Sequence, residues 1–348
     1  MSSFPWLMRS SSSAGGPRFA LGDPLVDSYL VFVAGRARAN TLRAVTHDLK
    51  TFFGVVDKEP AEVVAADVFD FLAHQRGDRT VVRISDGESG LSARTIARRL
   101  SSISGFYGYL VARGDTGVQS NPVPRGLSTR RRGGRRLQVP LVRVPRTLPK
   151  ILSPAEVNAL VAALRTDRDR AMVLAMVLGG LRRCEVLGLT VRDIQVPERS
   201  LFVAEGKGGH QRVVPISNVF FAAVGDYLRS ERPRDTDTDR VFVALKGPTR
   251  GRPLSADGID TILRAARQRA GLDRATCHQL RHTCLTRLRE AGMQLEAVQA
   301  QAGHASIEST RIYLHLTDDW LADEYRRAAE RIDADHAAEL LAVQEINQ

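Results

Sequence analysis

The spacing of apolar positions predicts a chain built mainly of helices, beginning with four helices over residues 23–122. Amphipathic stretches begin near Leu25 and Thr41, a third covers residues 61–75, and Ser92 is suited to cap the start of a fourth. The apolar face of the fourth stretch repeats at helical spacing through Ile96, Leu100, Ile103, Tyr107 and Leu110. Four helices with short connections indicate a small all-α bundle.

The residues ahead of this bundle, 1–22, are rich in serine and glycine and lack the continuous apolar segment of a signal peptide. They predict a disordered tail. The polar face of the fourth helix carries Arg94, Arg98 and Arg99. A charged helix face is either simply solvated or lies against a polyanion such as DNA, and both hypotheses stay open.

Residues 151–332 predict a second domain, in which helices accompany a small antiparallel sheet. It opens at Ser153-Pro154-Ala155-Glu156, which has the form of a capping box, and helical patterns follow to about Leu189. Gly206-Lys207-Gly208-Gly209 predicts a hairpin turn. Short β-like runs surround that turn at 194–196, 201–204 and 213–216. Helical patterns return at 218–232, at 255–270 and from 278 almost to the end. We expect residues 333–348 to be a C-terminal tail or helix.

Residues 123–150 differ in character from both domains, because prolines interrupt them and acidic residues are absent. The basic residues of this segment are Arg125, Arg130, Arg131, Arg132, Arg135, Arg136, Arg143, Arg146 and Lys150. Such a block is not expected to bury a core and repels itself when left alone. It predicts an exposed interdomain linker that also lies across DNA phosphates.

The net charge of +11, from 50 basic and 39 acidic side chains, favours a polyanionic partner such as nucleic acid. Anionic membranes attract basic chains as well, but no apolar run reaches the ~18 residues needed to span a bilayer. Cys184, Cys277 and Cys284 form no paired framework. We therefore expect reduced thiols that pack as small buried apolar groups in a cytoplasmic protein.

Six separated side chains carry groups suited to breaking a phosphodiester bond: Arg182, Lys207, His278, Arg281, His304 and Tyr313. The reaction needs a nucleophile, positive charge on the non-bridging oxygens and a proton for the leaving oxygen. A phenol, guanidinium groups and an ammonium group supply these. No paired carboxylates and no His/Cys metal spacing lie beside the candidates, which favours a site without metal or other cofactor.

Each candidate alone also has an ordinary structural interpretation. Arg182 and Glu185 could form an i, i+3 pair on a helix, and Lys207 could lie in a plain exposed hairpin. Tyr313 could be a packed core residue. The joint order of the motifs is what favours the chemical interpretation.

In that order the motifs resemble those of the tyrosine recombinases, the family of phage integrases and Xer recombinases. The family pattern is Gly-Leu-Arg-x-x-Glu, a lysine in a Gly-Lys-Gly hairpin, His-x-x-Arg, Gly-His and a tyrosine nine residues later. The matching residues are Gly180-Leu181-Arg182 with Glu185, Gly206-Lys207-Gly208, His278 with Arg281, Gly303-His304, and Tyr313. The match spans residues 153 to about 332. The first domain, ending at Asn121-Pro122, resembles the core-binding domain of the family less specifically.

The resemblance implies a mainly α fold with a small antiparallel β-sheet. A four-helix, SAM-like core-binding domain and a catalytic domain would form a C-shaped clamp on DNA. Tyr313 would attack a DNA phosphate to give a 3′-phosphotyrosine and a free 5′-hydroxyl. Arg182 and Arg281 would hold the non-bridging oxygens, and Lys207 would protonate the leaving oxygen. The remaining roles would be proton transfer from Tyr313 for His278, a hydrogen bond to the phosphate for His304, and orientation of the other groups for Glu185.

The chain departs from the family pattern at three positions. Arg183 stands where an aliphatic residue is usual, Ala302 where leucine often precedes Gly-His, and His210 where lysine is common. We interpret His282 as structural and His210 as a possible phosphate contact. Beyond the motif, a helical face formed by Leu321, Tyr325, Ala328 and Ile332 predicts either packing within the chain or docking into a neighbouring protomer.

The resemblance implies a site-specific recombinase, first an integrase or transposase of a mobile element and alternatively an Xer-type chromosome-dimer resolvase. Its partner would be a double-stranded recombination site, bound by a tetrameric homo-oligomer or together with a related recombinase, and no membrane. We expect it in the bacterial cytoplasm, at the nucleoid. A type IB topoisomerase shares the chemistry. A catalytically idle DNA-binding regulator is disfavoured because it needs no full set of phosphate-handling residues.

Overall fold

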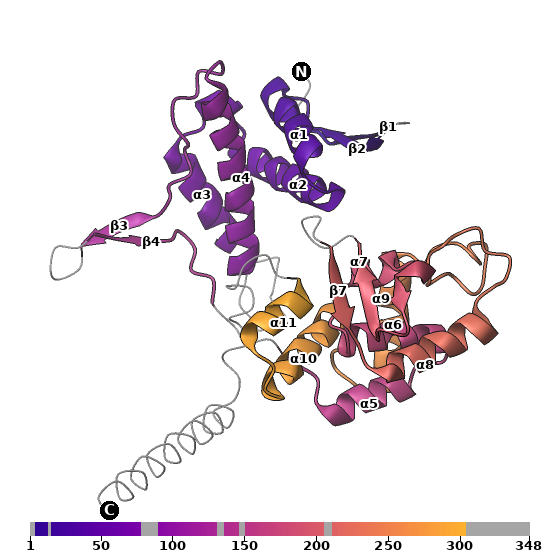
Figure 1. The fold of residues 1–348 in the computed structure, drawn as a ribbon. Coiled ribbons are helices and arrows are strands. Elements are labelled where there is room, and N and C mark those ends of the chain that lie inside the picture. The colour runs from indigo at the N-terminus through magenta and orange to yellow at the C-terminus, as the bar shows by residue number, and fades with distance from the viewer. Residues whose placement is uncertain are drawn as a thin grey trace, which may run out of the picture. The chain divides into compact units, whose positions relative to one another are not determined.

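The computed structural model describes residues 4–12, 15–77, 90–130, 136–145, 150–204 and 211–303. The chain divides into two compact units (Figure 1), Met1–Arg146 and Thr147–Gln348. Each unit has its own hydrophobic core. Both units are mainly helical with small antiparallel sheets, which the sequence predicts for the second unit only. The candidate chemistry lies in the second unit.

The first unit contains the four predicted helices, and two of them start at side-chain caps. The Asp23 carboxylate accepts hydrogen bonds from the backbone N–H groups of Leu25 and Val26, both at 2.9 Å, at the start of the first helix. The Ser92 hydroxyl accepts from the N–H of Thr95 at 3.2 Å and caps the fourth helix, as predicted. The helices are α1 Pro24–Arg36, α2 Ala39–Val56, α3 Ala65–Gly77 and α4 Ala93–Arg113, with the short helix η1 Pro60–Glu62 between α2 and α3.

Aromatic side chains fill the core of this bundle. Phe52 of α2 meets Phe71 of α3 edge to face, with 5.1 Å between ring centroids. Phe53 of α2 meets Phe106 of α4 in the same way at 5.9 Å. Tyr107 is fully buried, and its hydroxyl donates to the carbonyl of Pro60 at 3.0 Å. Burial of these rings, together with a partner for the buried hydroxyl of Tyr107, holds the helices together.

The first unit also contains two hairpins that the sequence did not predict. Strands β1 Met8–Ser12 and β2 Gly15–Ala20 pair antiparallel, so the expectation of a disordered tail is wrong for these residues. The reason is apolar burial: Phe19 is 8% exposed and Leu21 is fully buried in the bundle core. Within the expected linker, β3 Leu127–Arg130 pairs antiparallel with β4 Arg136–Val139. Val123 and Val142 are buried as well, so this segment adds to the first core.

The second unit is arranged around helix α6 Asp167–Val177, most of whose residues are buried. A helix that is buried nearly all round must have neighbours on every side. Helices α8 Asn218–Asp226 and α10 Cys277–Glu290 both pack against it. The capping box predicted at Ser153 is present at the start of α5 Pro154–Ala162. The other helices of this unit are α7 Arg183–Gly188, η2 Val191–Asp193, η3 Tyr227–Glu231, α9 Ala256–Arg269 and α11 Leu295–Ala302.

A three-stranded antiparallel sheet lies beside these helices, as predicted. Its order is β5 Ile194–Gln195, β6 Ser200–Val203 and β7 Arg212–Pro215. Leu201 pairs with both Ile194 and Val214, so the centre of the sheet is apolar. Strands β6 and β7 pair on either side of the predicted hairpin turn, which itself lies outside the described residues.

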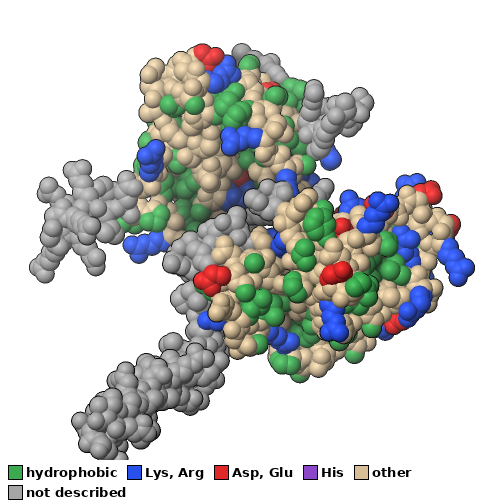
Figure 2. All heavy atoms as spheres, viewed as in Figure 1, with side chains coloured by type: hydrophobic (Ala, Val, Ile, Leu, Met, Phe, Trp, Pro, Cys, Tyr) green, Lys and Arg blue, Asp and Glu red, His purple; other side chains and the backbone are tan. Residues whose placement is uncertain are grey.

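On the face shown in Figure 2, lysine and arginine side chains are scattered over both units among apolar and uncharged atoms. On this face, the distribution of basic side chains alone does not locate a binding site. Within the described parts of the chain, no helix is both long and apolar enough to cross a membrane.

Candidate active site

A tight turn between α6 and α7 positions Arg182. Gly180 has a φ of +67°, which a residue with a side chain rarely adopts, and a Cβ atom there would lie 3.2 Å from the side chain of Leu285. Leu181 is fully buried and fixes the turn against the core. Arg182 is consequently placed at the N-cap of α7, with its side chain 19% exposed.

Glu185, one turn into α7, gathers the arginines of the site around its carboxylate, which is 0% exposed. Its Oε1 accepts from Nη1 of Arg182 at 2.7 Å and its Oε2 from the backbone N–H of Arg182 at 2.8 Å. Arg212, at the start of β7, donates from Nη1 to Oε1 at 3.0 Å and from Nη2 to Oε2 at 2.8 Å. Nη1 of Arg281 lies 3.9 Å from Oε2. Three guanidinium groups from separate elements therefore surround one carboxylate.

The ionisation of Glu185 follows from these contacts. Burial alone raises the pKa of the Glu185 carboxyl, but the hydrogen bonds and charges of Arg212 and Arg182 outweigh burial and lower that pKa to about 2. Glu185 is thus a fixed negative charge at neutral pH. It balances part of the positive charge without accepting or giving protons.

This low pKa predicts an acid-sensitive stability of the second unit. A carboxyl whose pKa is lowered from 4.5 unfolded to about 2 folded stabilises the protein above pH 4.5 and loses that contribution as the pH falls toward 2. The contribution is about 3 kcal/mol at neutral pH. Urea unfolding across this pH window should therefore show Glu185→Gln destabilised near pH 4.5, with the difference from the unmodified protein shrinking toward pH 2. A difference that stays constant across the window would contradict the assignment.

Arg281 lies in the middle of α10, 3% exposed. It donates to the carbonyl of Gly180, two residues before Arg182 in the chain, and from Nη2 to the carbonyl of Ala302 at 2.6 Å. Arg182 donates in turn from Nη2 to the carbonyl of Gly303 at 3.1 Å. The fold therefore brings Arg182, Arg281 and the end of α11 together, although these residues are far apart in the sequence.

His278, one turn before Arg281 on α10, is exposed and contacts a second histidine. Its Nε2 lies 2.7 Å from Nε2 of His282, and the two rings meet edge to face with 4.1 Å between centroids. Burial, helped by His278 and the charge of Arg281, lowers the pKa of His282 to about 4. A neutral His282 holds the ring of His278 through this contact. We interpret His282 as orienting a candidate catalytic group in addition to packing.

Several predicted site residues lie outside the described residues, and their roles stay predictions: Lys207, His210, His304, Tyr313, Arg131, Arg132 and Arg135. Arg130 and Arg136 face each other in the register of the β3–β4 hairpin. The site geometry accordingly rests on Arg182, Glu185, Arg212, His278 and Arg281.

The arginines predicted on the polar face of α4 have partners in the first unit. Arg98 pairs with the carboxylate of Asp48 on α2, whose side chain is 2% exposed, and Nε of Arg99 lies 3.8 Å from the same carboxylate. Arg99 also donates to the side chain of Gln75. Arg94 is exposed. Arg98 and Arg99 thus have a structural role in compensating a buried acid, and contact with DNA stays a prediction for all three.

Arg183, which departs from the family pattern, pairs with Asp260 of α9 and ties the start of α7 to that helix. The Sγ of Cys277 lies 3.8 Å from the same Asp260, and burial raises the pKa of the Cys277 thiol to about 12. Cys284 is buried likewise. Cys184 is exposed, so the expectation of burial is wrong there. It lies on the outer side of α7, whose inner side is formed by Glu185 and Val186.

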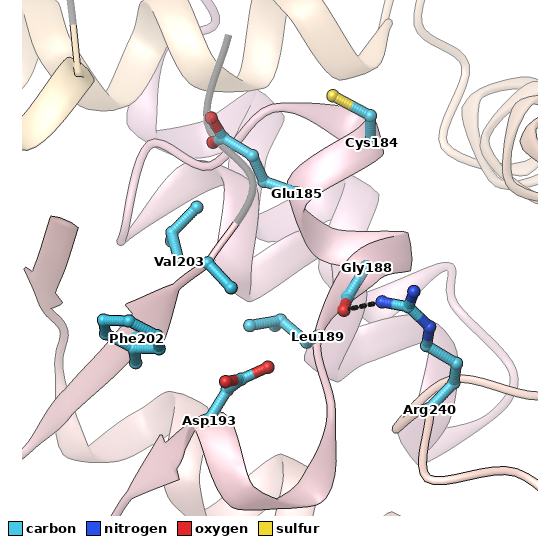
Figure 3. A pocket seen from close by; sticks show the side chains of 9 residues that line it. Cys184, Glu185, Gly188, Leu189, Asp193, Phe202, Val203 and Arg240 are labelled. Atoms are coloured by element: carbon cyan, nitrogen blue, oxygen red, sulfur yellow. Dashed lines mark hydrogen bonds between the residues drawn. The ribbon is translucent and has the colours of Figure 1, made fainter. Parts of the chain in front are cut away.

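A small pocket on α7 contains no further candidate. Figure 3 shows its lining, in which Arg240 reaches the carbonyl of Gly188. The one other carboxylate there, Asp193, accepts hydrogen bonds from the N–H and hydroxyl of Thr190 at 2.7 and 2.9 Å. Asp193 is therefore a capping residue of η2.

The sequence interpretation missed Arg212. The sequence feature that could have indicated Arg212 is a basic residue at the start of an otherwise apolar strand, Arg212-Val213-Val214-Pro215, just after the predicted hairpin turn. A buried arginine requires a buried acid, and only the folded chain brings Glu185 to it.

Comparisons with known proteins find relatives that match along most of the chain. The family model described as phage integrase family matches residues 150–319, and the model described as phage integrase, N-terminal SAM-like domain matches residues 26–114. A tyrosine recombinase XerC of Pelotomaculum thermopropionicum is 29% identical over 88% of this chain and 98% of its own length. A tyrosine recombinase XerA of Pyrococcus furiosus is 30% identical over 83% of this chain and 88% of its own.

Among solved structures, the Tn1549 transposon integrase in complex with transposon right end DNA shares the fold. The TM-score is 0.63 at 19% identity, over 87% of this chain and 98% of that one. The two family models and the curated relatives agree on one family. The chain therefore belongs to the phage integrase family of tyrosine recombinases, enzymes that exchange DNA strands.

Proposed function

We propose that this recombinase cuts and rejoins duplex DNA at a specific site through a 3′-phosphotyrosine formed by Tyr313. The observation that carries the proposal is the convergence of Arg182, Arg212 and Arg281 on Glu185 and on the end of α11. His304 directly follows that end in the chain, and Tyr313 follows nine residues later.

The charge of this cluster suits a phosphodiester. Three arginines carry three positive charges and Glu185 carries one negative charge, which leaves a net charge of +2. A phosphodiester brings one negative charge, and more charge collects on its oxygens as the phenolate attacks. Preorganised guanidinium groups stabilise that developing charge without having to rearrange.

The resemblance to tyrosine recombinases implies the steps, and the chemistry of the residues suits them. Tyr313 attacks the scissile phosphate, with His278 assisting the transfer of the phenol proton. Arg182 and Arg281 hold the non-bridging oxygens, His304 donates a hydrogen bond to the phosphate, and Lys207 protonates the leaving 5′-oxygen. Attack by a 5′-hydroxyl from another strand reverses the step and releases Tyr313. The phosphate bond is exchanged rather than hydrolysed, so the reaction requires no nucleotide cofactor.

Two biological roles share this chemistry. We infer an integrase or transposase of a mobile element that acts on DNA as a tetramer in the cytoplasm. The second candidate, an Xer-type chromosome-dimer resolvase, is favoured by curated relatives that match along most of the chain. Deleting the gene should abolish circular excision products, detected by outward-facing primers at the element ends, and leave chromosome segregation intact. Accumulation of chromosome dimers instead would favour the resolvase role.

Relaxation of supercoiled DNA separates a recombinase from a type IB topoisomerase. A recombinase acts at its own site and needs a second site for strand exchange, whereas a topoisomerase relaxes any supercoiled plasmid as a monomer. We expect little relaxation of a plasmid that lacks the site. Efficient relaxation of such a plasmid would contradict the proposal.

The arginines of the segment 123–150 should contribute electrostatic affinity for DNA. Each lysine or arginine that neutralises a phosphate contributes roughly 0.9 to the slope of log affinity against log salt. Replacing Arg130, Arg131, Arg132, Arg135 and Arg136 with glutamine should weaken binding and reduce that slope by about 2 to 4. Fluorescence anisotropy over a salt series measures it. An unchanged slope would show that these arginines do not contact phosphate.

A further inference from the structure

Arg212 occupies the centre of the site but has no part in the chemistry assigned above. We propose that Arg212 is a positioning residue, which anchors the Glu185 carboxylate and the end of α11 so that Arg182 and Arg281 are presented to the phosphate. The proposal rests on the proposed function for its catalytic consequence, while the anchoring itself can be measured without DNA.

All three nitrogen atoms of the Arg212 guanidinium already donate to protein acceptors. Nη1 and Nη2 each bind one oxygen of Glu185, at 3.0 and 2.8 Å, and Nε donates to the carbonyl of Gln301 at 3.2 Å. The side chain is 10% exposed, about half the exposure of Arg182. These bonds direct Arg212 at Glu185 and at the end of α11, which position the site, and in this proposal Arg212 acts on the phosphate through them.

The end of α11 is held by three arginines in succession. Arg212 donates to the carbonyl of Gln301, Arg281 to that of Ala302, and Arg182 to that of Gly303. The last carbonyls of a helix have no partner within the helix, so side chains that bind them fix where the helix ends. The chain that leaves this end leads directly to His304.

Gly303 makes room for Arg212. Its φ is +59°, and a Cβ atom there would lie 2.9 Å from Nη1 and 3.0 Å from Cδ and Cζ of Arg212. The guanidinium group thus packs against a position where any side chain would collide with it. The glycine of the Gly303-His304 motif is required both by the left-handed backbone and by the presence of Arg212.

The charge balance depends on Arg212 as well. Among the described residues, the charged groups in contact with Glu185 are Arg182 from the same helix, Arg212 from β7 and Arg281 from α10, while α11 contributes carbonyls. Arg212 supplies a bond to each carboxylate oxygen. Without Arg212, Glu185 keeps its burial and loses its strongest partner, so it takes up a proton at a higher pH. A protonated Glu185 holds Arg182 less firmly.

The test compares Arg212→Gln and Arg212→Lys with the unmodified full-length chain. Two readouts are needed. The first is the titration of Glu185, followed by ¹³C NMR of glutamate-labelled protein without DNA, with the Glu185 signal assigned by means of Glu185→Gln. The second is the single-turnover cleavage rate of a nicked suicide DNA substrate, measured across pH. For Arg212→Gln we expect the titration to move upward from about 2 and the cleavage rate to fall about tenfold to a hundredfold. The rate should also rise with pH as Glu185 ionises. Lysine keeps the charge but not the fork that binds both oxygens, so Arg212→Lys should be intermediate.

Arg240→Gln is the matched control, because Arg240 also donates to a carbonyl of α7, that of Gly188, without contacting Glu185. It should leave both the Glu185 titration and the shape of the pH profile unchanged. An unchanged titration in Arg212→Gln would overturn the proposal, as would a lowered rate whose pH profile keeps its original shape. If Arg212→Gln does not fold, the same two outcomes in Arg212→Lys, an unchanged Glu185 titration or an unchanged shape of the pH profile, would overturn the proposal. Should the unmodified chain fail to cleave DNA, the proposed function fails, while the NMR titration still decides whether Arg212 anchors Glu185.

Discussion

Replacing Tyr313 with phenylalanine is expected to abolish covalent attachment to DNA while DNA affinity stays within about tenfold. The substitution removes only the phenol oxygen, which is the nucleophile in the proposed mechanism. A single neutral hydrogen bond contributes about 0.5–1.5 kcal/mol, so the loss in binding is small.

Suicide substrates, in which a nick lets the released fragment diffuse away, trap the covalent complex for detection by denaturing electrophoresis. Tyr109→Phe is a useful control, because it removes a phenol of the first unit that contacts Ser28 at 3.0 Å. It should retain covalent attachment. Covalent complex in Tyr313→Phe at the level of the unmodified protein would refute the nucleophile assignment.

Replacing Arg281 with lysine should lower the cleavage rate by about a hundredfold to a thousandfold, the usual effect of removing one preorganised donor from a site of developing negative charge. Lysine keeps the positive charge of Arg281, so the expected loss of cleavage rate comes from the changed geometry of the hydrogen-bond donors. Lysine cannot span the carbonyls of Gly180 and Ala302 with one planar group and still face the phosphate. The rate constant for formation of the covalent complex at saturating protein measures the effect.

The thermal midpoint of the same variant separates catalysis from stability. Arg281 is 3% exposed, so some loss of stability is expected alongside the loss of rate. Comparing rates well below the midpoint of the variant removes that contribution. A rate within about threefold of the unmodified protein would show that the planar fork of Arg281 is not needed for catalysis.

The parts of this protein that could be predicted from sequence are those determined by neighbouring residues. Ser92 and Ser153 mark helix starts because a hydroxyl can bind an N–H group three residues ahead, and both caps are present. The Arg182–Glu185 pair is likewise local, since one helical turn separates its members. The catalytic motifs were found through their order along the chain, and the structure brings Arg182 and Arg281 to a common carboxylate.

The features that sequence reasoning missed depend on contacts between distant segments. Arg98 was predicted on an open polar face, but its acid partner Asp48 lies on another helix, fifty positions earlier. Arg212 and Glu185 are likewise separated by 27 positions. The tail was predicted to be disordered because serine and glycine dominate it, yet burial of Phe19 and Leu21 in the bundle core stabilises a hairpin there. Periodicity within one segment cannot reveal which distant segment will supply a partner.

In the proposed mechanism, Tyr313 carries the DNA after cleavage and the arginine cluster around Glu185 holds the phosphate. Mass spectrometry of proteolysed covalent complex tests it most directly, because the fragment that retains a nucleotide identifies the attacking residue. We expect a nucleotide linked through its 3′-phosphate to the tyrosine of the segment Ile312-Tyr313-Leu314. A nucleotide on any other residue, or linkage through a 5′-phosphate, would contradict it.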